Sequence, residues 1–235
     1  MPDSFTFFKN QIGMTALPTL QLGSPFDFEK QATLVMIQDA PPPDWREEVL
    51  RPFYNSMLRR YLTETQGGAF VLFTSYQLLK RTASDMTSWL AEQRFPLLIQ
   101  GEGMPRSEMV RQFKAVSGSV LFGTDSFWQG VDVPGDALRN VIITKLPFLV
   151  PSQPVVEAKI EMIKSRGGNP FKEYQLPVAI LKFKQGFGRL IRTRTDSGLV
   201  VVLDPRIHSK SYGRQFIDAL PKCKIRIDKP AKNNE

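Results

Sequence analysis

The segment QGFGRLIRTRTD, from Gln185 to Asp196, holds side chains whose spacing suits the binding of an anion. On a helix, Arg189 and Arg192 would project from one face because they are three residues apart, and Gln185 would lie about one turn earlier. Two adjacent guanidinium groups offer planar, fixed sets of donors that match phosphate oxygens better than lysine does. The pattern therefore indicates an anion site.

Two glycines interrupt this basic segment. Gly186 and Gly188 would each cost about 1 kcal/mol relative to alanine inside a helix, so close packing against a neighbouring backbone or a ligand must offset them. The alternative interpretation is a helix with a solvated basic face. That alternative explains the arginines but leaves the glycines unexplained.

A second polar segment, LFGTDSFWQGVDVPGDALRN, follows an apolar run that ends at Phe122. Ligands of open α/β sheets bind beyond the carboxyl ends of the strands, where glycine allows a close approach of the backbone. Asp132 is able to accept hydrogen bonds from a ribose hydroxyl or an arginine. The alternative is an ordinary loop between a strand and a helix, whose Gly and Asp residues serve turns and caps.

A third segment, FTSYQLLK, places Thr74, Ser75 and Tyr76 between an apolar run and an amphipathic one. Hydroxyl groups and free backbone N–H groups at a helix N-terminus suit a phosphate. Taken alone, the segment is better explained by a plain N-cap formed by Thr74 or Ser75.

Short apolar runs alternate with longer amphipathic stretches along most of the chain. Such runs indicate strands buried on both faces, and hence a parallel sheet in an α/β fold. The predicted strands are ATLVMIQ, GGAFVLFTS, PLLIQ, GSVLFGT, RNVIITKLPF and GLVVVLD. Helices are predicted from Asp44, as N-cap, to about 65, at 77–93, near 107–115 and near 212–220, with a short helix before residue 15. Residues 149–197 form a longer connection, with two helices around SRGGNPF, than a simple crossover requires.

The composition favours a polyanionic partner and a reducing compartment. The chain has 31 Lys and Arg against 23 Asp and Glu, which gives a net charge of +8, so nucleic acid or nucleotide is the favoured partner. One cysteine, Cys223, and one histidine, His208, exclude a disulfide within the chain and clustered zinc ligands. No apolar run is long enough to span a membrane, and we expect a cytoplasmic protein.

The chain lacks the loop that normally holds a triphosphate. No G-x-x-x-x-G-K-[ST] sequence occurs, and no acidic cluster follows a strand to hold magnesium. A nucleotide bound here would therefore meet only part of its site on this chain.

Five segments in order resemble the C-terminal half of DinG-type helicases, in the superfamily that includes the xeroderma pigmentosum group D helicase. The resemblance runs from about Phe5 to Pro221. The segments are LGSPFDFEKQATL, LFTSYQLL, LFGTDSFWQGVDVPGDALRNVIITKLPF, KQGFGRLIRTRTDSGLVVVLDPR and KSYGRQFIDALP.

The resemblance implies a three-layer α/β fold of the RecA-like, P-loop NTPase-like kind. It implies ATP and Mg²⁺ shared with a first RecA-like domain absent from this chain, and no iron–sulfur cluster in this chain. The expected divisions are a lead-in at 1–30, the domain at 31–228 with a helical elaboration at 149–184, and a polar tail at 229–235.

The resemblance also implies roles for individual residues. Gln185 would orient the attacking water, Arg189 and Arg192 would be arginine fingers, and Gly130, Asp132 and Gly188 would contact the nucleotide. Many relatives carry glutamate where this chain has Gln129, which puts the role of that position in doubt. Along the DNA path the resemblance places Thr74, Ser75, Tyr76, Thr124, Ser126, Phe127 and Trp128. Arg194 is expected to be solvated.

The resulting hypothesis is the second motor domain of an ATP-dependent DNA helicase that unwinds 5′ to 3′. Its partners would be single-stranded or forked DNA and the first RecA-like domain of the same protein, and the isolated chain would not hydrolyse ATP. The alternative hypothesis is a non-catalytic nucleic-acid-binding module that retains the fold.

Overall fold

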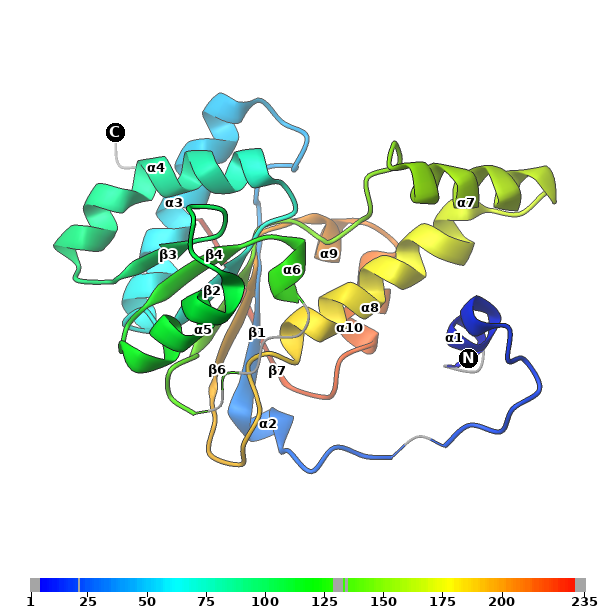
Figure 1. Ribbon diagram of the computed structural model, residues 1–235, viewed down its shortest axis with the longest axis horizontal. Helices are drawn as coiled ribbons and strands as arrows, with labels where there is room; N and C mark the ends of the chain where they lie inside the picture. Colours follow the sequence, from blue (N-terminus) through cyan, green and yellow to red (C-terminus); the bar gives the residue numbers. More distant parts are fainter. Residues whose placement is uncertain (1–4, 21, 129–132, 134, 231–235) are drawn as a thin grey trace. The chain divides into compact units, whose positions relative to one another are not determined.

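The computed structural model describes residues 5–20, 22–128, 133 and 135–230 (Figure 1). Two compact units make up the chain: residues 1–25 with 148–181, and residues 26–147 with 182–235. All the described strands and the three polar segments lie in the second unit.

A parallel sheet forms the centre of the second unit, as predicted. Its order is β3-β4-β2-β5-β6-β1-β7, and every strand pair in it is parallel. The strands are β1 Ala32–Ile37, β2 Ala69–Leu72, β3 Leu97–Ile99, β4 Val120–Gly123, β5 Asn140–Ile143, β6 Gly198–Val202 and β7 Lys224–Asp228. The seventh strand, β7, was not among the six predicted, and it pairs with β1 at the edge of the sheet.

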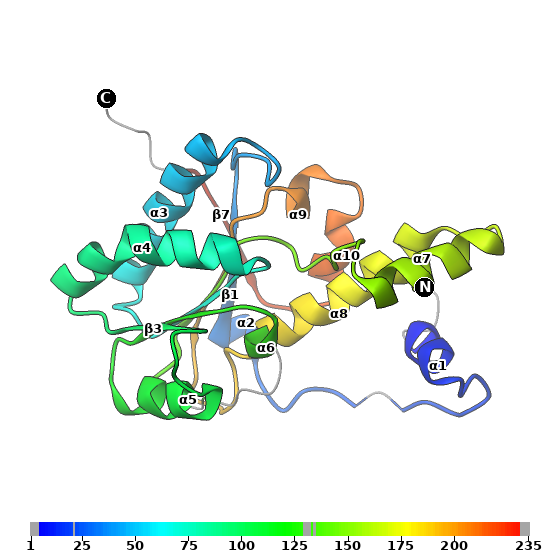
Figure 2. The ribbon, with the colours of Figure 1, turned by 45° about the horizontal axis from the view of Figure 1, so that its top comes forward.

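Helices cover both faces of this sheet. Val71 and Phe122 join a buried cluster with the α3 and α4 side chains, whereas Phe70 packs on Phe113 of α5 with ring centroids 4.6 Å apart. Figures 1 and 2 both draw α4 and α5 on opposite sides of the sheet. This arrangement explains why the strands read as continuous apolar runs instead of alternating ones, and the predicted three-layer α/β class is confirmed.

The helices predicted in the second unit are present, with a later start for α3, but the short helices α2, α6 and α9 were not predicted. The helices of this unit are α2 Phe28–Gln31, α3 Glu47–Glu64, α4 Tyr76–Glu92, α5 Arg106–Ala115, α6 Asp125–Trp128, the last half of α8 Leu176–Phe187, α9 Arg206–Ser209 and α10 Gly213–Asp218. Asp44 was predicted to cap α3, but Arg46 is the N-cap and makes no side-chain cap. The Trp45 N–H instead bonds Pro42 O at 3.0 Å, so the chain turns once more before the helix begins.

The first unit has a small apolar cluster of its own. Its helices are α1 Thr6–Ile12, α7 Pro154–Ser165, the π-helical turn η1 Phe171–Gln175 and the first half of α8. Val156, Ile163 and Tyr174 are buried together, with Phe7 packed against them. The unit includes most of the segment for which the sequence predicts a helical elaboration, together with most of the predicted lead-in.

Because all the strands are parallel, their carboxyl ends lie together along one border of the sheet and their amino ends along the opposite border. We call these borders the carboxyl edge and the amino edge. Leu72 of β2 pairs with Gly123 of β4, and Ile99 of β3 pairs with Phe122, so three strands end side by side. At the other edge, Ala32 and Gly198 pair where β1 and β6 begin. The polar segments that follow β2 and β4 therefore lie at the carboxyl edge, whereas the segment that precedes β6 reaches the amino edge.

Candidate nucleotide and nucleic-acid sites

Arg189 and Arg192 do not share a helix face, contrary to the prediction. Helix α8 ends at Phe187. The Gly188 N–H still bonds Lys184 O at 2.9 Å, but the Arg189 N–H bonds Gly186 O at 3.2 Å. This shift from four-residue to three-residue spacing tightens the last turn and ends the helix. The two arginines therefore lie on the loop 188–197, which we call the arginine loop.

Arg189 turns into the protein. Its side chain donates from Nε and Nη2 to the carbonyl oxygen of Trp128, at 3.2 and 2.8 Å. Only 6% of the residue is exposed, whereas Arg192 is exposed. Hydrogen bonds from a charged donor to a buried carbonyl are strong, so Arg189 joins the arginine loop firmly to α6.

A buried carboxylate, Asp196, holds the backbone around Arg192. It accepts from the N–H groups of Arg192 at 2.8 Å, Thr193 at 2.9 Å and Gly135 at 3.1 Å, and also from the Thr193 hydroxyl. The Thr193 hydroxyl in turn accepts from the Asp196 N–H at 3.2 Å. This reciprocal pattern is that of a capping box, here in a loop.

Asp196 is ionised because these donors surround it. Burial acts to raise the pKa of its carboxyl, but the hydrogen bonds from Thr193, Arg192 and Gly135 together lower that pKa below its usual value. The Gln31 amide also donates to the carbonyls of Thr193 and Asp196, at 2.9 and 2.8 Å. The sequence analysis gave neither residue a role. The spacing T-x-x-D from Thr193 is a capping-box signal that points to Asp196, whereas no local pattern points to Gln31.

The two glycines have different explanations. A Cβ atom on Gly186 would lie 3.0 Å from the Trp128 ring and 3.5 Å from Leu72. Close packing, one of the two reasons that the sequence suggested, therefore accounts for Gly186. Gly188 follows the end of the helix, so the cost of glycine inside a helix does not apply to it.

At the carboxyl edge, Ser75 caps α4. Its hydroxyl accepts from the Leu78 N–H at 3.4 Å, which is a long bond. Ser75 and Tyr76 are exposed and Thr74 is half-buried. The Lys80 ammonium lies 4.9 Å from the centre of the Tyr76 ring, a cation–π contact. Capping by Ser75 agrees with the plainer interpretation, while its weak geometry leaves the hydroxyl accessible.

Thr124, at the end of β4, is bonded to the neighbouring strand end. Its N–H and its hydroxyl both donate to Oε1 of Gln100, at 2.7 and 3.1 Å. Ser126, on α6, is exposed. We call the group formed by Ser75, Tyr76, Gln100, Thr124 and Ser126 the carboxyl rim.

Phe127 and Trp128 are fully buried, although the resemblance places them toward DNA. The Trp128 indole N–H donates to the carbonyl of Phe73 at 3.4 Å. The Phe127 ring lies under the guanidinium carbon of Arg106, 5.5 Å from the ring centre. Neither ring has a free face for a base in this structure, and both brace α6 against the sheet.

Positions 129–132 and 134 of the second polar segment, among them Gln129, Gly130 and Asp132, lie outside the described residues. The two ends of the segment are described. Thr124 is bonded to Gln100 at the carboxyl edge, and Gly135 is bonded to Asp196 beside the amino edge. One described end of the segment therefore belongs to the carboxyl rim, and the other is bonded to the arginine loop.

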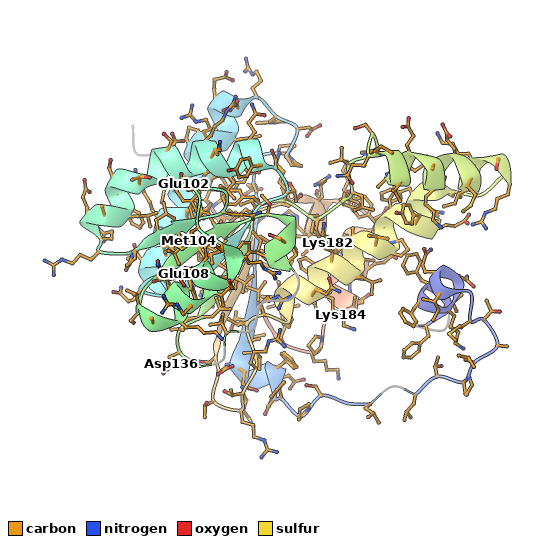
Figure 3. The ribbon with its side chains drawn as sticks, viewed as in Figure 1. Glu102, Met104, Glu108, Asp136, Lys182 and Lys184 are labelled. Carbon is orange, nitrogen blue, oxygen red and sulfur yellow. The ribbon has the colours of Figure 1, made fainter. Side chains whose placement is uncertain are left out.

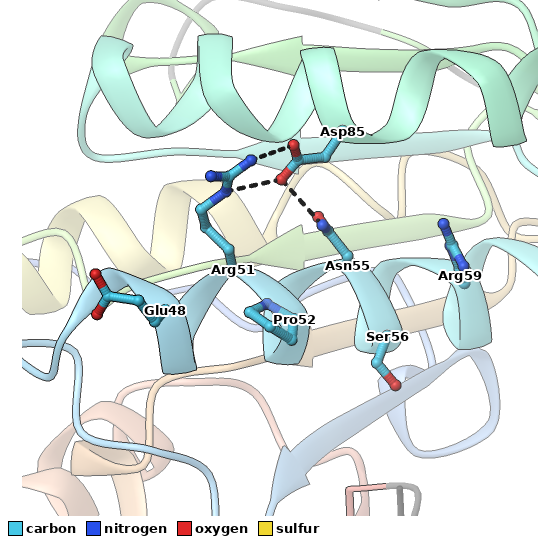
Figure 4. Close-up of a pocket in the computed structure, with 7 residues that line it drawn as sticks. All are labelled: Glu48, Arg51, Pro52, Asn55, Ser56, Arg59 and Asp85. Carbon is cyan, nitrogen blue, oxygen red and sulfur yellow. Dashed lines mark hydrogen bonds and ion pairs between the residues drawn. The ribbon is translucent and has the colours of Figure 1, made fainter. Parts of the chain in front are cut away.

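In a depression between α3 and α4, three of the lining side chains are bonded to one another (Figure 4). Asp85 on α4 accepts from Arg51 at 2.5 and 3.1 Å and from Asn55 at 3.0 Å, both on α3. These bonds join two helices, so the depression has a structural explanation. Among the described residues no cluster of three potential metal-binding side chains occurs, and no helix of theirs is long and apolar enough to cross a membrane.

Comparison with known proteins identifies the family of the chain. Residues 58–223 match the family model of the helicase C-terminal domain. The chain is 37% identical over 219 residues to the ATP-dependent DNA helicase YoaA of Escherichia coli, and 39% identical over 234 residues to the ATP-dependent DNA helicase DinG of Photobacterium profundum. It is 35% identical over 231 residues to the 3′-5′ exonuclease DinG of Bacillus subtilis. These alignments cover 93%, 96% and 94% of the chain but only 34%, 33% and 24% of the relatives.

Solved structures support the fold at lower identity. An XPD structure without ligand superposes with a TM-score of 0.64 and 16% identity, over 85% of the chain and 40% of that protein. The second domain of the DEAD-box helicase Mss116p, bound to an RNA duplex, superposes with a TM-score of 0.54 and 13% identity, over 86% of the chain and 65% of that protein. The chain belongs to the helicase C-terminal domain family, and it shares its α/β fold with these XPD and DEAD-box helicase structures.

Proposed function

We propose that this chain is the second motor domain of an ATP-dependent DNA helicase that moves 5′ to 3′ along single-stranded or forked DNA. The observation that carries the proposal is that the arginine loop is bonded to both described ends of the second polar segment: Arg189 donates to the Trp128 carbonyl, and Asp196 accepts from the Gly135 N–H. The groups proposed to meet the nucleotide and the segment that follows β4 are therefore directly connected. The proposal includes the domain bounds 31–228 and a cytoplasmic location.

In this proposal ATP and Mg²⁺ are bound mainly by a first RecA-like domain, and this chain completes the site. Hydrolysis spreads negative charge over the γ-phosphate, and an arginine held against it stabilises the transition state by several kcal/mol. Arg192 is exposed on a loop that Asp196 fixes, which suits that role. Arg189 would have to exchange the Trp128 carbonyl for phosphate. Gln185 is exposed on the last turn of α8 and would orient the attacking water, while Gly130, Asp132 and Gly188 would line the nucleotide.

The DNA backbone would be bound at the carboxyl rim and by Thr74 beside it; the proposed contacts are Thr74, Ser75, Tyr76, Thr124 and Ser126. Exposed hydroxyl groups and a nearby Lys80 are the groups that contact phosphates without reading sequence. In the same proposal Phe127 and Trp128 do not contact DNA, and their buried rings hold α6 in place. No iron–sulfur cluster is bound by this chain.

The test joins this chain to a first RecA-like domain of a DinG-like helicase and measures ATP hydrolysis with and without single-stranded DNA. We expect DNA-stimulated hydrolysis, lowered about 10³-fold by Arg192→Ala and unchanged by Arg194→Ala, a matched exposed arginine two residues away. Equal rates for the two variants would refute the arginine-finger assignment. DNA binding without any hydrolysis would favour the non-catalytic module instead, and the chain alone is expected to be inactive.

A further inference from the structure

Gln100 has an amide whose orientation is determined by its partners. It follows β3 directly and is half-buried. Its Oε1 atom lies 2.7 Å from the Thr124 backbone nitrogen and 3.1 Å from the Thr124 hydroxyl. A backbone N–H can only donate, so the atom facing it must be the amide oxygen. The Nε2 group of Gln100 therefore points away from Thr124.

This bond changes what Thr124 can offer to a ligand. The hydroxyl and backbone protons of Thr124 are both directed to Gln100, which leaves only lone pairs on the hydroxyl oxygen. Phosphodiester oxygens accept hydrogen bonds and donate none. In this arrangement the Thr124 hydroxyl has no proton for a phosphate, whereas Gln100 has two amide protons. Among the described residues none accepts a hydrogen bond from that Nε2 group.

The surroundings of Gln100 contain one cation that favours a phosphate, Lys80, and two carboxylates, Glu102 and Glu108, of which Glu108 is paired with Arg111. Gly101 has a positive φ of 90°, and a Cβ atom there would lie 2.0 Å from the Tyr76 hydroxyl, so the turn after Gln100 packs tightly on Tyr76. Lys80 supplies a cation beside that ring. Glu102 is an opposing charge on the same segment, which continues past Met104 to Glu108 on α5 (Figure 3). Glu108 is neutralised by Arg111, with bonds of 2.7 Å.

We propose that Gln100 binds a backbone phosphate of single-stranded nucleic acid through its Nε2 group, and that Thr124 is the positioning residue that aims it. This inference rests on the proposed function, whose list of DNA contacts it changes. It replaces a hydroxyl donor at Thr124 with an amide donor one strand away, next to Tyr76.

The test compares Gln100→Glu with a matched variant, Gln93→Glu, in the full chain. A carboxylate at position 100 still accepts both bonds from Thr124, but it has no donor and adds a negative charge. Gln93 is an exposed residue at the opposite end of α4, and its variant has the same net charge. We expect binding of a labelled oligothymidylate at low salt to weaken about tenfold with Gln100→Glu and less than about twofold with Gln93→Glu.

Two further variants separate the outcomes. Thr124→Val removes the hydroxyl and keeps the backbone bond to Gln100, so we expect less than about a twofold loss. Gln100→Ala adds no charge and should weaken binding about threefold, which provides a second measurement if Gln100→Glu lowers the unfolding midpoint. Equal binding by the Gln100→Glu and Gln93→Glu chains, or a large loss with Thr124→Val alone, would overturn the inference. No binding by the unaltered chain would instead overturn nucleic-acid binding itself.

Discussion

The arginine loop and the carboxyl rim lie toward opposite edges of one sheet and are built in opposite ways. In the arginine loop, buried groups fix the backbone: Asp196 accepts hydrogen bonds from three backbone N–H groups, and the Arg189 side chain donates to the Trp128 carbonyl. In the carboxyl rim, exposed side chains such as Ser75 and Tyr76 stand at strand ends, and the one short bond joins Gln100 to Thr124.

This difference fits the two tasks proposed for them. Stabilising a transition state requires a group fixed before the reaction, since reorganisation during catalysis would consume the gain. Contact with a moving strand requires donors that face solvent and bind any sequence. We therefore expect variants of the arginine loop to affect stability strongly, and variants of the rim to affect binding with little change in stability.

The largest expected effect is the loss of the Asp196 carboxylate. Asp196→Ala leaves the N–H groups of Arg192, Thr193 and Gly135 without their acceptor, which should lower the free energy of unfolding by about 2–4 kcal/mol. Asp85→Ala is the control, because it removes a carboxylate that accepts three hydrogen bonds, all from side chains, at a half-buried position between α3 and α4. Its cost should be about 1 kcal/mol or less.

Urea unfolding followed by circular dichroism measures both variants. If Asp196→Ala destabilises the chain no more than Asp85→Ala does, the arginine loop is not held by its buried carboxylate, and the contrast between the two regions fails.

Low pH should remove the stabilisation that the Asp196 carboxylate provides. The pKa of Asp196 is lowered in the folded chain, so its stabilisation is fully present above the pKa of the unfolded chain, about 3.9, and is lost as the pH falls through the folded pKa. The difference in unfolding midpoint between the unaltered chain and Asp196→Asn should therefore be constant from about pH 5 to 7 and shrink below about pH 4. A difference that persists unchanged at pH 3 would contradict this explanation.

A smaller effect is expected where the rim is packed most tightly. Gly101→Ala introduces a Cβ atom at a positive φ and against the Tyr76 hydroxyl, at a cost of about 1–3 kcal/mol. Tyr76→Ala removes the clash but not the backbone strain, so the substitution at Gly101 should cost less in that background. Equal costs in both backgrounds would mean that Tyr76 does not rest on Gly101.

Sequence patterns predicted the fold better than they predicted the sites. Apolar runs flanked by amphipathic stretches are local signals, and six strands and the layer order followed from them. The exposure of Arg192 and the burial of Arg189 could not follow, because both depend on where α8 ends and on a carbonyl distant in sequence, that of Trp128. The role of Gln100 could not be predicted from the sequence for a similar reason, since only the pairing of β3 with β4 brings this residue to Thr124.

The smallest expected change in stability distinguishes a helix cap from a phosphate contact at Ser75. Asp is as good an N-cap as Ser and also favours the positive end of the helix dipole, so Ser75→Asp should alter the free energy of unfolding by less than about 0.5 kcal/mol. Ser75→Ala loses the cap and should cost about 0.5–1 kcal/mol.

Ser75→Asp should lose less stability than Ser75→Ala but more affinity for oligothymidylate. Ser75→Asp puts a negative charge beside the proposed phosphate path, and we expect it to weaken binding about fivefold or more, whereas Ser75→Ala should weaken it about twofold. Ser88→Asp, at an exposed position near the far end of α4, controls for net charge. If Ser75→Asp and Ser88→Asp bind equally well, Ser75 is only a cap. If Ser75→Asp alone loses binding while its stability is unchanged, contact with DNA and stability are separable at the rim.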